Sequence, residues 1–535
     1  MFALFISTTL AAPAADYVAS FPGYGFTKFP HYSGFLNASA AEDGTYLHYW
    51  LATYTASDKP WTKAPTVLWL NGGPGASSLL GMLQEQGPLI IDSSGKLVEN
   101  PYAWTDVANL IALESPAGVG YSYCAAMASG GSCANTDVST AKAAYAALVD
   151  FFTKFPELQK NPFYITGESY AGVYCPTLAA EIVSGNMHSA VKIDLVGMAV
   201  GDPCTDTQAQ KQSMDMLWYA HKNGLVQDNE YDFLVNKCGA SMPSDRMAGE
   251  WVADKSARVV PSKPTRPKLL STSANCTAAM RRYLVASSKG ISQSWDHAFI
   301  NELSFYSPAA EFRFDIPGTL NYHTAKWMMA ADVKAALHVA TAPVKAWPGP
   351  APGWKYTSSY DACNAAPPGT KSMVDFYREL APKLAGQIVV YNGDTDPCVS
   401  YEGTRNAIAQ VGFDEVSPYR AWFFNYTAAD LKLLQRKDLL FGPSLSLQAG
   451  GSQYGGSIVN YEHGLAFATV HGSGHMVPTF RPRAALQMLT HVVHNTSFAP
   501  PVPADAALVK MSDSEFDDFL DKWVMTAKGG AYVGK

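Results

Sequence analysis

Six apolar runs of strand length end in loops that carry glycine or aspartate. They occupy 64–75, 107–123, 161–172, 192–203, 386–397 and 465–478. Between some of these runs, over 137–155 and 371–386, apolar residues recur at helical spacing, and they do so again after the last run, over 483–493. Apolar strands that alternate with helices predict an α/β fold with a central, mostly parallel sheet flanked by helices on both faces.

The segmentation predicts one large domain interrupted by an insertion. One such domain fits 535 residues as well as three separate domains would. The predicted segments are a first core part over 17–205, a largely helical cap over 206–320, a second core part over 321–499 and a tail over 500–535. Within the first part, residues 35–54 predict a pair of strands with a turn at 42–44.

Composition excludes several classes of protein. Apolar residues make up 47% and charged residues 16%, so a large core is available and disorder is excluded. The net charge of −7 comes without a basic patch, which excludes nucleic acid as a partner. No apolar run approaches the ~20 residues of a membrane span, so no integral membrane segment is predicted.

Residues 1–16 predict the remnant of a signal peptide. The segment MFALFISTTLAAPAAD is apolar and ends in small residues, although it has no basic start. Eight cysteines, none in a CxxC pair, favour disulfides over zinc; Cys124–Cys133 and Cys238–Cys276 are the pairs we expect. Candidate glycosylation sequons begin at Asn37, Asn275, Asn425 and Asn495. Together these features predict the secretory route and an extracellular or vacuolar/lysosomal enzyme.

The hexamer Gly167-Glu168-Ser169-Tyr170-Ala171-Gly172 lies between a strand and a helix. Small residues on each side let a serine project from a sharp strand-to-helix turn, so Ser169 is a candidate nucleophile. Ala171 stands where the strict G-x-S-x-G pattern has glycine, but alanine is also small. A helix N-cap serine is the structural alternative.

A serine nucleophile needs a base and an acid that orients the base, and in this class of fold they follow it in the order acid, then base. Asp396 is the favoured acid, with Asp394 as its rival in the same loop. His475 is the favoured base, with His471 as its rival and a purely structural histidine as the alternative.

The loop Asn71-Gly72-Gly73-Pro74-Gly75 follows an early strand. In this class of fold such a loop supplies one oxyanion-stabilising N–H, and the residue after the nucleophile supplies the other. We therefore predict Gly73 and Tyr170 as the donors. Taken alone, the loop is also compatible with an ordinary turn.

Five motifs in this order resemble the serine carboxypeptidase family, a group of α/β-hydrolases. They are 69–88, 100–123, 167–172, 391–398 and 474–478, and the resemblance spans roughly residues 20–495. It implies an α/β-hydrolase fold and a serine-type carboxypeptidase that cleaves C-terminal peptide bonds through an acyl-enzyme. It also implies the triad Ser169, Asp396 and His475, no metal and no organic cofactor.

The resemblance implies further that a substrate's free carboxylate is bound by Trp69, Asn71, Gly72, Glu85 and Glu168. Glutamates repel a carboxylate unless they hold a proton, so two close carboxyls that share one can donate to it. Best peptidase activity is therefore expected at acidic pH. The expected partners are peptides or proteins with a free C-terminus, and a monomer and a homodimer both stay open.

One departure from the family concerns a disulfide. The family usually has cysteine at the position of Ala76, and that cysteine pairs with one in a segment like 360–364. Cys363 is therefore expected either unpaired or bridged elsewhere. Relatives on the same fold include acyltransferases, hydroxynitrile lyases and non-catalytic protective proteins. Glu168 disfavours the first, because such acyltransferases often have aspartate there, and the complete triad disfavours the last.

Overall fold

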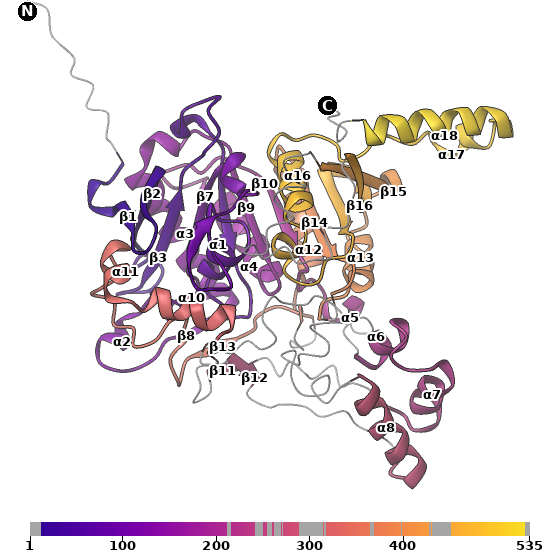
Figure 1. Cartoon of the computed structure of the whole chain (residues 1–535), viewed down its shortest axis with the longest axis horizontal. Helices are drawn as coiled ribbons and strands as arrows, with labels where there is room; N and C mark the ends of the chain where they lie inside the picture. Colours follow the sequence, from indigo (N-terminus) through magenta and orange to yellow (C-terminus); the bar gives the residue numbers. More distant parts are fainter. Residues whose placement is uncertain are drawn as a thin grey trace, which may run out of the picture.

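The computed structural model describes residues 12–210, 216–240, 250–253, 259–261, 269, 271–287, 314, 317–363, 369–396, 398–426, 430 and 451–529. Residues 1–11 of the predicted signal peptide and much of the predicted cap lie outside this described part. Among the described residues, eleven strands form one sheet (Figure 1). Their order is β1 (Tyr17–Phe21), β2 (Gly25–Asn37), β3 (Tyr46–Ala52), β7 (Asn109–Leu113), β4 (Thr66–Leu70), β9 (Phe163–Glu168), β10 (Leu195–Gly201), β14 (Ile388–Gly393), β17 (Leu465–Val470), β16 (Gly451–Tyr461) and β15 (Glu415–Tyr426).

The six strands from β7 to β17 in this order run parallel, and antiparallel strands complete both edges. This confirms the mostly parallel sheet. The predicted strand pair at 35–54 is also confirmed, because β2 and β3 are antiparallel neighbours. Parallel pairing brings the carboxyl ends of β9, β10, β14 and β17 to one edge of the sheet.

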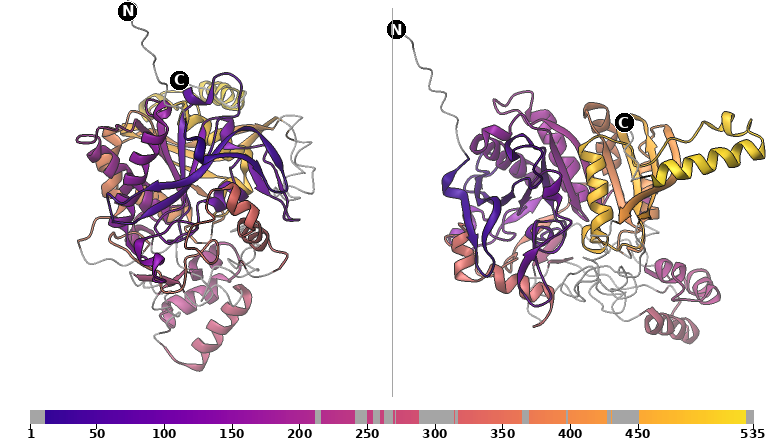
Figure 2. Two further views of the ribbon diagram at one scale, coloured as in Figure 1. Left: turned by 90° about the vertical axis from the view of Figure 1, so that its left-hand side faces the viewer. Right: turned by 45° about the horizontal axis from the view of Figure 1, so that its top comes forward.

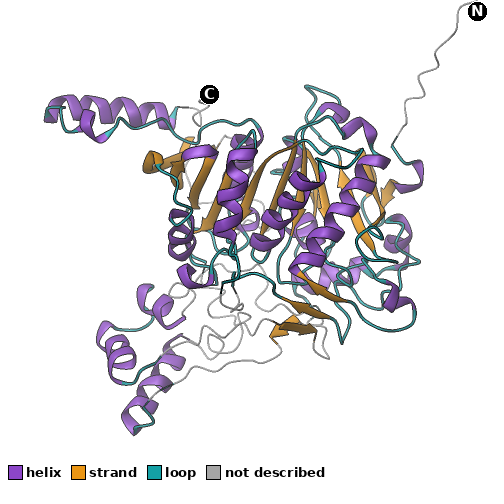
Figure 3. Ribbon diagram, turned by 180° about the vertical axis from the view of Figure 1, so that it is seen from behind, coloured by secondary structure: helices purple, strands orange, loops and turns teal. Residues whose placement is uncertain are grey.

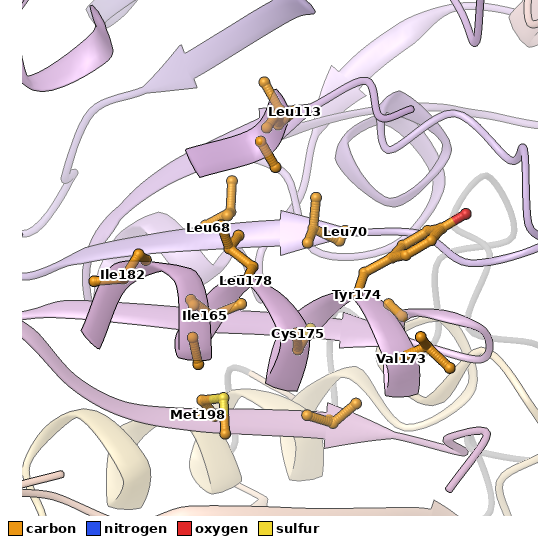
Figure 4. Packing of buried hydrophobic residues seen from close by; sticks show 14 of the residues in the cluster. Leu68, Leu70, Leu113, Ile165, Val173, Tyr174, Cys175, Leu178, Ile182 and Met198 are labelled. Atoms are coloured by element: carbon orange, nitrogen blue, oxygen red, sulfur yellow. The ribbon is translucent and has the colours of Figure 1, made fainter. Parts of the chain in front are cut away.

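Side chains of the central strands alternate between two buried cores. In β4, Leu68 and Leu70 belong to one hydrophobic cluster, while Val67 and Trp69 belong to the other. Figure 4 shows Leu68 and Leu70 packed with side chains of β9, β10 and α4 (Ala171–Gly185). Burial on both faces explains why these strands are apolar along their whole length.

Helices cover both faces of the sheet (Figure 3). Beside α4, the first face carries α3 (Asp137–Lys154), α12 (Met373–Leu380) and α13 (Tyr401–Ala409). The second face carries α1 (Leu79–Gln84), α10 (Leu320–Met328), α11 (Ala331–Ala336) and α16 (Pro482–Val493). The short helices α2 (Ala125–Ala128) and α15 (Val477–Phe480) lie in connecting segments.

The chain after β10 leaves the sheet and forms helices below it in the view of Figure 1. These are α5 (Thr207–Gln210), α6 (Met216–Lys222), α7 (Asp228–Asp232) and α8 (Ala274–Ser287). A small sheet lies nearby, in the order β12 (Val259–Pro261), β11 (Glu250–Ala253), β13 (Lys355–Thr357) and β8 (Ala134–Thr136). The hairpin of β5 (Leu89–Ile91) and β6 (Leu97–Glu99) is separate.

The C-terminal segment forms α17 (Asp505–Leu508) and α18 (Asp513–Lys528), and α18 extends beside β15 (Figure 2). The indole N–H of Trp523 donates to Pro500 O at 3.3 Å, which ties this helix to the body. None of the described helices is both long and apolar enough to cross a membrane.

Two predicted helices differ from the structure. The helix predicted over 371–386 is α12, which ends at Leu380 and continues only as a 3₁₀ turn over Ala381–Lys383. Pro382 has no N–H to donate, which explains the early end. The helix predicted around 208–223 appears as α5 and α6, and residues 211–215 between them are outside the described part.

Three disulfides cross-link the described residues. Cys124–Cys133 and Cys238–Cys276 are the two expected pairs and are confirmed. Cys363, whose partner was open, pairs with Cys204, three residues after the end of β10. This bond ties the carboxyl end of the central sheet to the segment that follows β13.

The Cys204–Cys363 and Cys124–Cys133 disulfides close loops of very different length, and this predicts different contributions to stability. Cys204–Cys363 spans 159 residues and Cys124–Cys133 spans 9. Loop entropy assigns them about 5 and about 2.5 kcal/mol respectively. The Cys204→Ala/Cys363→Ala variant should therefore lose more unfolding free energy in urea than Cys124→Ala/Cys133→Ala. Equal losses in the two variants would contradict this.

Candidate active site

Ser169 sits on a sharp turn between β9 and α4. Its φ is +64°, which non-glycine residues rarely adopt. The backbone N–H of Ser169 donates to Gly201 O at 2.9 Å, and its carbonyl accepts from Cys204 N at 3.0 Å. The helix N-cap is Tyr170, so Ser169 does not cap α4. A half-buried serine held at positive φ in a sharp strand-to-helix turn has the geometry of a nucleophile elbow.

The neighbours of the turn have to be small. A Cβ at Gly167 would lie 2.5 Å from Leu70 O, and one at Gly172 would lie 2.3 Å from Cys204 O. Ala171, which departs from the strict motif, fits because its methyl group faces the glycine at 167. The turn therefore packs closely against the end of β4 on one side and the chain that follows β10 on the other.

Asp396 and His475 form a buried hydrogen-bonded pair. His475 Nδ1 lies 2.7 Å from Asp396 Oδ2, and both side chains are almost fully buried. Asp396 also accepts from Cys398 N at 2.8 Å and from Val399 N at 3.2 Å. These donors hold the carboxylate in place, and Asp396 in turn orients the imidazole ring.

The two rival residues pair with each other near the surface instead. His471 Nδ1 lies 2.7 Å from Asp394 Oδ2, and Gly472 N donates to Asp394 Oδ1 at 2.7 Å. The hydrogen bond that Asp394 accepts raises the pKa of His471, whose side chain is 59% exposed. This second Asp–His pair is solvated and shapes the loops, whereas the buried pair has the environment of an acid–base couple.

The loop after β4 lies directly on the nucleophile turn. A Cβ at Gly72 would lie 2.2 Å from Tyr170 N and 2.8 Å from Ser169 Cβ. Gly73 has a φ of +107°, which glycine adopts readily. Within the described part of the chain, neither the Gly73 nor the Tyr170 N–H donates to a backbone carbonyl. Both are available to a developing oxyanion.

Two buried glutamates meet at the side chain of Asn71. Asn71 Nδ2 donates to Glu168 Oε1 at 2.8 Å and is 3.4 Å from Glu85 Oε1. Trp69 is fully buried, and its indole N–H donates to Asn71 Oδ1 at 2.8 Å. Trp69 therefore orients the amide. The second oxygens of Glu85 and Glu168 receive no hydrogen bond from any described residue.

The pKa values of both glutamates lie above the ordinary range for a carboxyl group. Burial raises the pKa of Glu85 to about 8, with the Asn71 amide acting in the opposite direction. Burial, followed by the nearby charge of Glu85, raises the pKa of Glu168 well above its usual value. Neutral carboxyls are hydrogen-bond donors, so this pair can present O–H groups to an anion.

Sequence reasoning missed Asp202, a buried carboxyl beside the Asp–His pair. Ligand atoms of Asp202, Asp396 and His475 all lie within 4.8 Å of one another. Three such groups could hold a metal ion by distance alone, but the Asp396–His475 hydrogen bond already engages two of them. Asp202 follows the apolar run 192–203, so the strand-end rule that selected Asp396 could have found it.

The candidate glycosylation sites differ in exposure. Asn37, Asn275 and Asn495 are exposed, whereas Asn425 is half-buried in β15. Three of the four side chains are therefore open to modification, and glycosylation itself stays a prediction.

The sequence model of the serine carboxypeptidase family matches residues 22–495. The chain belongs to the serine carboxypeptidase family. It is 30% identical over 519 residues to serine carboxypeptidase-like 34 of Arabidopsis thaliana, with 92% of this chain and 91% of that protein covered. It is 31% identical to the lysosomal protective protein of Mus musculus, with 91% and 95% covered.

A solved structure supports the fold. Kex1(Δ)p, a prohormone-processing carboxypeptidase from Saccharomyces cerevisiae, superposes with a TM-score of 0.59 at 19% identity, covering 88% of this chain and 92% of that one. At that identity the likeness shows the fold alone. The chain has the predicted α/β-hydrolase fold.

The two Asp–His pairs provide a matched test of the site. Asp396→Asn should lower kcat roughly 10⁴-fold, because an amide at this position favours the wrong imidazole tautomer. Asp394→Asn changes the same atoms in the exposed pair and should change kcat by less than about threefold. Steady-state kinetics on an ester substrate measures both. Equal losses would contradict the assignment of Asp396 and His475.

Proposed function

We propose that this protein is a serine-type carboxypeptidase that releases C-terminal residues from peptides and proteins through an acyl-enzyme. The observation that carries this proposal is the buried pair of Glu85 and Glu168, which meet at Asn71 and have raised pKa values; Glu168 directly precedes Ser169 in the chain. A pair that can donate to a carboxylate next to a nucleophile selects peptides with a free C-terminus.

The chemistry starts with attack by Ser169 Oγ on the carbonyl carbon of the last peptide bond. His475 accepts the serine proton, and Asp396 stabilises the imidazolium that forms. The N–H groups of Gly73 and Tyr170 donate to the oxyanion. His475 then passes the proton to the leaving amine, and water hydrolyses the acyl-enzyme in a second round with the same groups.

Substrate recognition falls to the cluster around Asn71. Protonated Glu85 and Glu168 would donate O–H groups to the terminal carboxylate. Gly72 would let the substrate approach without steric conflict, and Trp69 would keep the Asn71 amide in position. Recognition of this kind does not need a metal or an organic cofactor.

We also propose that the protein acts in the secretory pathway, either outside the cell or in a vacuolar or lysosomal compartment. Three disulfides among the described residues favour an oxidising route of maturation. Exposed sequon asparagines are compatible with that route.

A pair of matched peptides tests the activity. The peptides share one sequence, and one has a free C-terminus while the other is amidated. Single residues should be released from the free peptide only, and Ser169→Ala should lose this activity by roughly 10⁶-fold. Mass spectrometry of the products reads the outcome.

No release from either peptide would contradict the carboxypeptidase proposal. Transfer of an acyl group from an activated ester to an alcohol would then identify an acyltransferase. Neither hydrolysis nor transfer would identify a non-catalytic protein on the same fold.

The raised pKa values of the glutamate pair predict how peptide affinity depends on pH. Proton loss creates negative charge that repels the substrate carboxylate, so binding is strongest at acidic pH and weakens as pH rises through about 8. The KM for the free peptide should rise across this range. Glu85→Gln/Glu168→Gln cannot ionise there and should flatten the rise, although its absolute KM changes.

An uncharged ester substrate is the control for this pH dependence. It has no terminal carboxylate, so its KM should not follow the glutamate pair. A free-peptide kcat/KM that increases above neutrality in the wild type would contradict carboxylate recognition by protonated glutamates.

A further inference from the structure

We propose that Asp202 is a positioning residue that holds the triad aspartate by donating a carboxyl O–H to Asp396. This inference rests on the proposed triad of Ser169, Asp396 and His475. In this arrangement Asp202 is a neutral carboxylic acid next to the negatively charged Asp396.

The surroundings of Asp202 leave one of its oxygens without a donor. Asp202 is fully buried, and its Oδ1 accepts from Asn392 Nδ2 at 3.2 Å and from Gly393 N at 3.0 Å. Its Oδ2 is also buried and receives no hydrogen bond from any described residue. A buried carboxylate oxygen without a donor is costly, whereas a protonated oxygen beside an acceptor is not.

Asp396 is that acceptor. A carboxylate oxygen of Asp396 lies within 4.8 Å of a carboxylate oxygen of Asp202. Asp396 already accepts hydrogen bonds from three N–H groups, those of His475, Cys398 and Val399. Those donors stabilise its negative charge. Two carboxyls this close and this buried cannot both ionise, so the proton stays on Asp202.

The neighbouring carboxyls Asp396 and Glu168 both disfavour a charge on Asp202, whereas the Gly393 N–H favours one. Burial, followed by the charge of Asp396 and a hydrogen bond with it, raises the pKa of Asp202 well above its usual value, and Glu168 adds to the effect. Tyr391, on β14, has its own pKa raised mainly by burial and then by Asp202. His475 is the nearby group that becomes positive, and its Nδ1 is bonded to Asp396.

The backbone also suits this role. Asp202 has a φ of +44°, a conformation that aspartate and asparagine adopt more easily than most residues. Its N–H donates to Tyr391 O at 2.7 Å, which fixes it between the ends of β10 and β14. Asparagine at this position would keep the acceptor oxygen and supply an N–H donor, whereas alanine would lose both.

The test measures inactivation of the full-length enzyme by a small fluorophosphonate, which labels Ser169 and has no terminal carboxylate. The second-order rate constant is followed against pH, and labelling is read by mass spectrometry. Asp202→Ala should label at least about tenfold more slowly because Asp396 loses a charge-assisted donor. Asp202→Asn should recover most of that loss.

The acid limb of the pH profile is the decisive readout. If Asp202 is neutral, Asp202→Asn removes no charge, and its acid limb should agree with that of the wild type within about 0.3 pH unit. If Asp202 were charged, its removal would disfavour the imidazolium form of His475 and move the acid limb about one unit lower. That shift would overturn the proposal even if Asp202→Ala does not fold.

Two further outcomes are distinguishable. If Asp202→Ala is labelled as fast as the wild type and only its Tm is lower, then Asp202 contributes to stability alone. That result would also overturn the proposal. A wild-type enzyme that is not labelled at Ser169 would instead overturn the proposed triad. Asp92→Asn, a buried carboxyl in the β5–β6 hairpin, is the control and should leave both rate and profile unchanged.

Discussion

The active site depends on backbone hydrogen bonds that join successive strand ends across the sheet. Ser169 N donates to Gly201 O, Asp202 N donates to Tyr391 O, and Asp394 N donates to Val470 O. These bonds continue the parallel ladder one step beyond β9, β10 and β14. The candidate nucleophile, acid and base therefore sit on loops whose relative positions are set by the register of one rigid sheet.

Around these strand ends the protein buries several carboxyls but very little charge. Burial raises the pKa of Glu85, Glu168 and Asp202, and nearby carboxyls raise the pKa of Glu168 and Asp202 further. Asp396 has three N–H donors and is the carboxyl equipped to be negative. Charge is thus concentrated on the group that must stabilise an imidazolium, and the neutral acids serve as donors.

Local sequence signals predicted most of the fold because each central strand is an apolar run followed by a loop that carries glycine or aspartate. The same signals gave Ser169, Asp396 and His475 as candidates, but chain order alone did not separate Asp394 from Asp396 or His471 from His475, and the family resemblance favoured Asp396 over Asp394. They could not find the Cys204–Cys363 bond, which joins segments 159 residues apart, or the early end of α12 before Pro382. They also missed Asp202: its position after an apolar run marks a strand end, but its proposed role depends on Asp396, in the loop after a different strand.

The direct adjacency of Glu168 and Ser169 gives a physical reason for exopeptidase action. Consecutive Cα atoms are about 3.8 Å apart, so the backbone keeps Glu168 next to the nucleophile, and the hydrogen bond from Asn71 Nδ2 holds its carboxyl group. Asn71, held by the indole of Trp69, joins Glu168 to Glu85 and fixes the other side of that cluster. Under the proposed function, a peptide whose carboxylate is bound by this cluster would present its last peptide bond to Ser169. On this argument, specificity for chain ends follows from one peptide unit of the nucleophile turn.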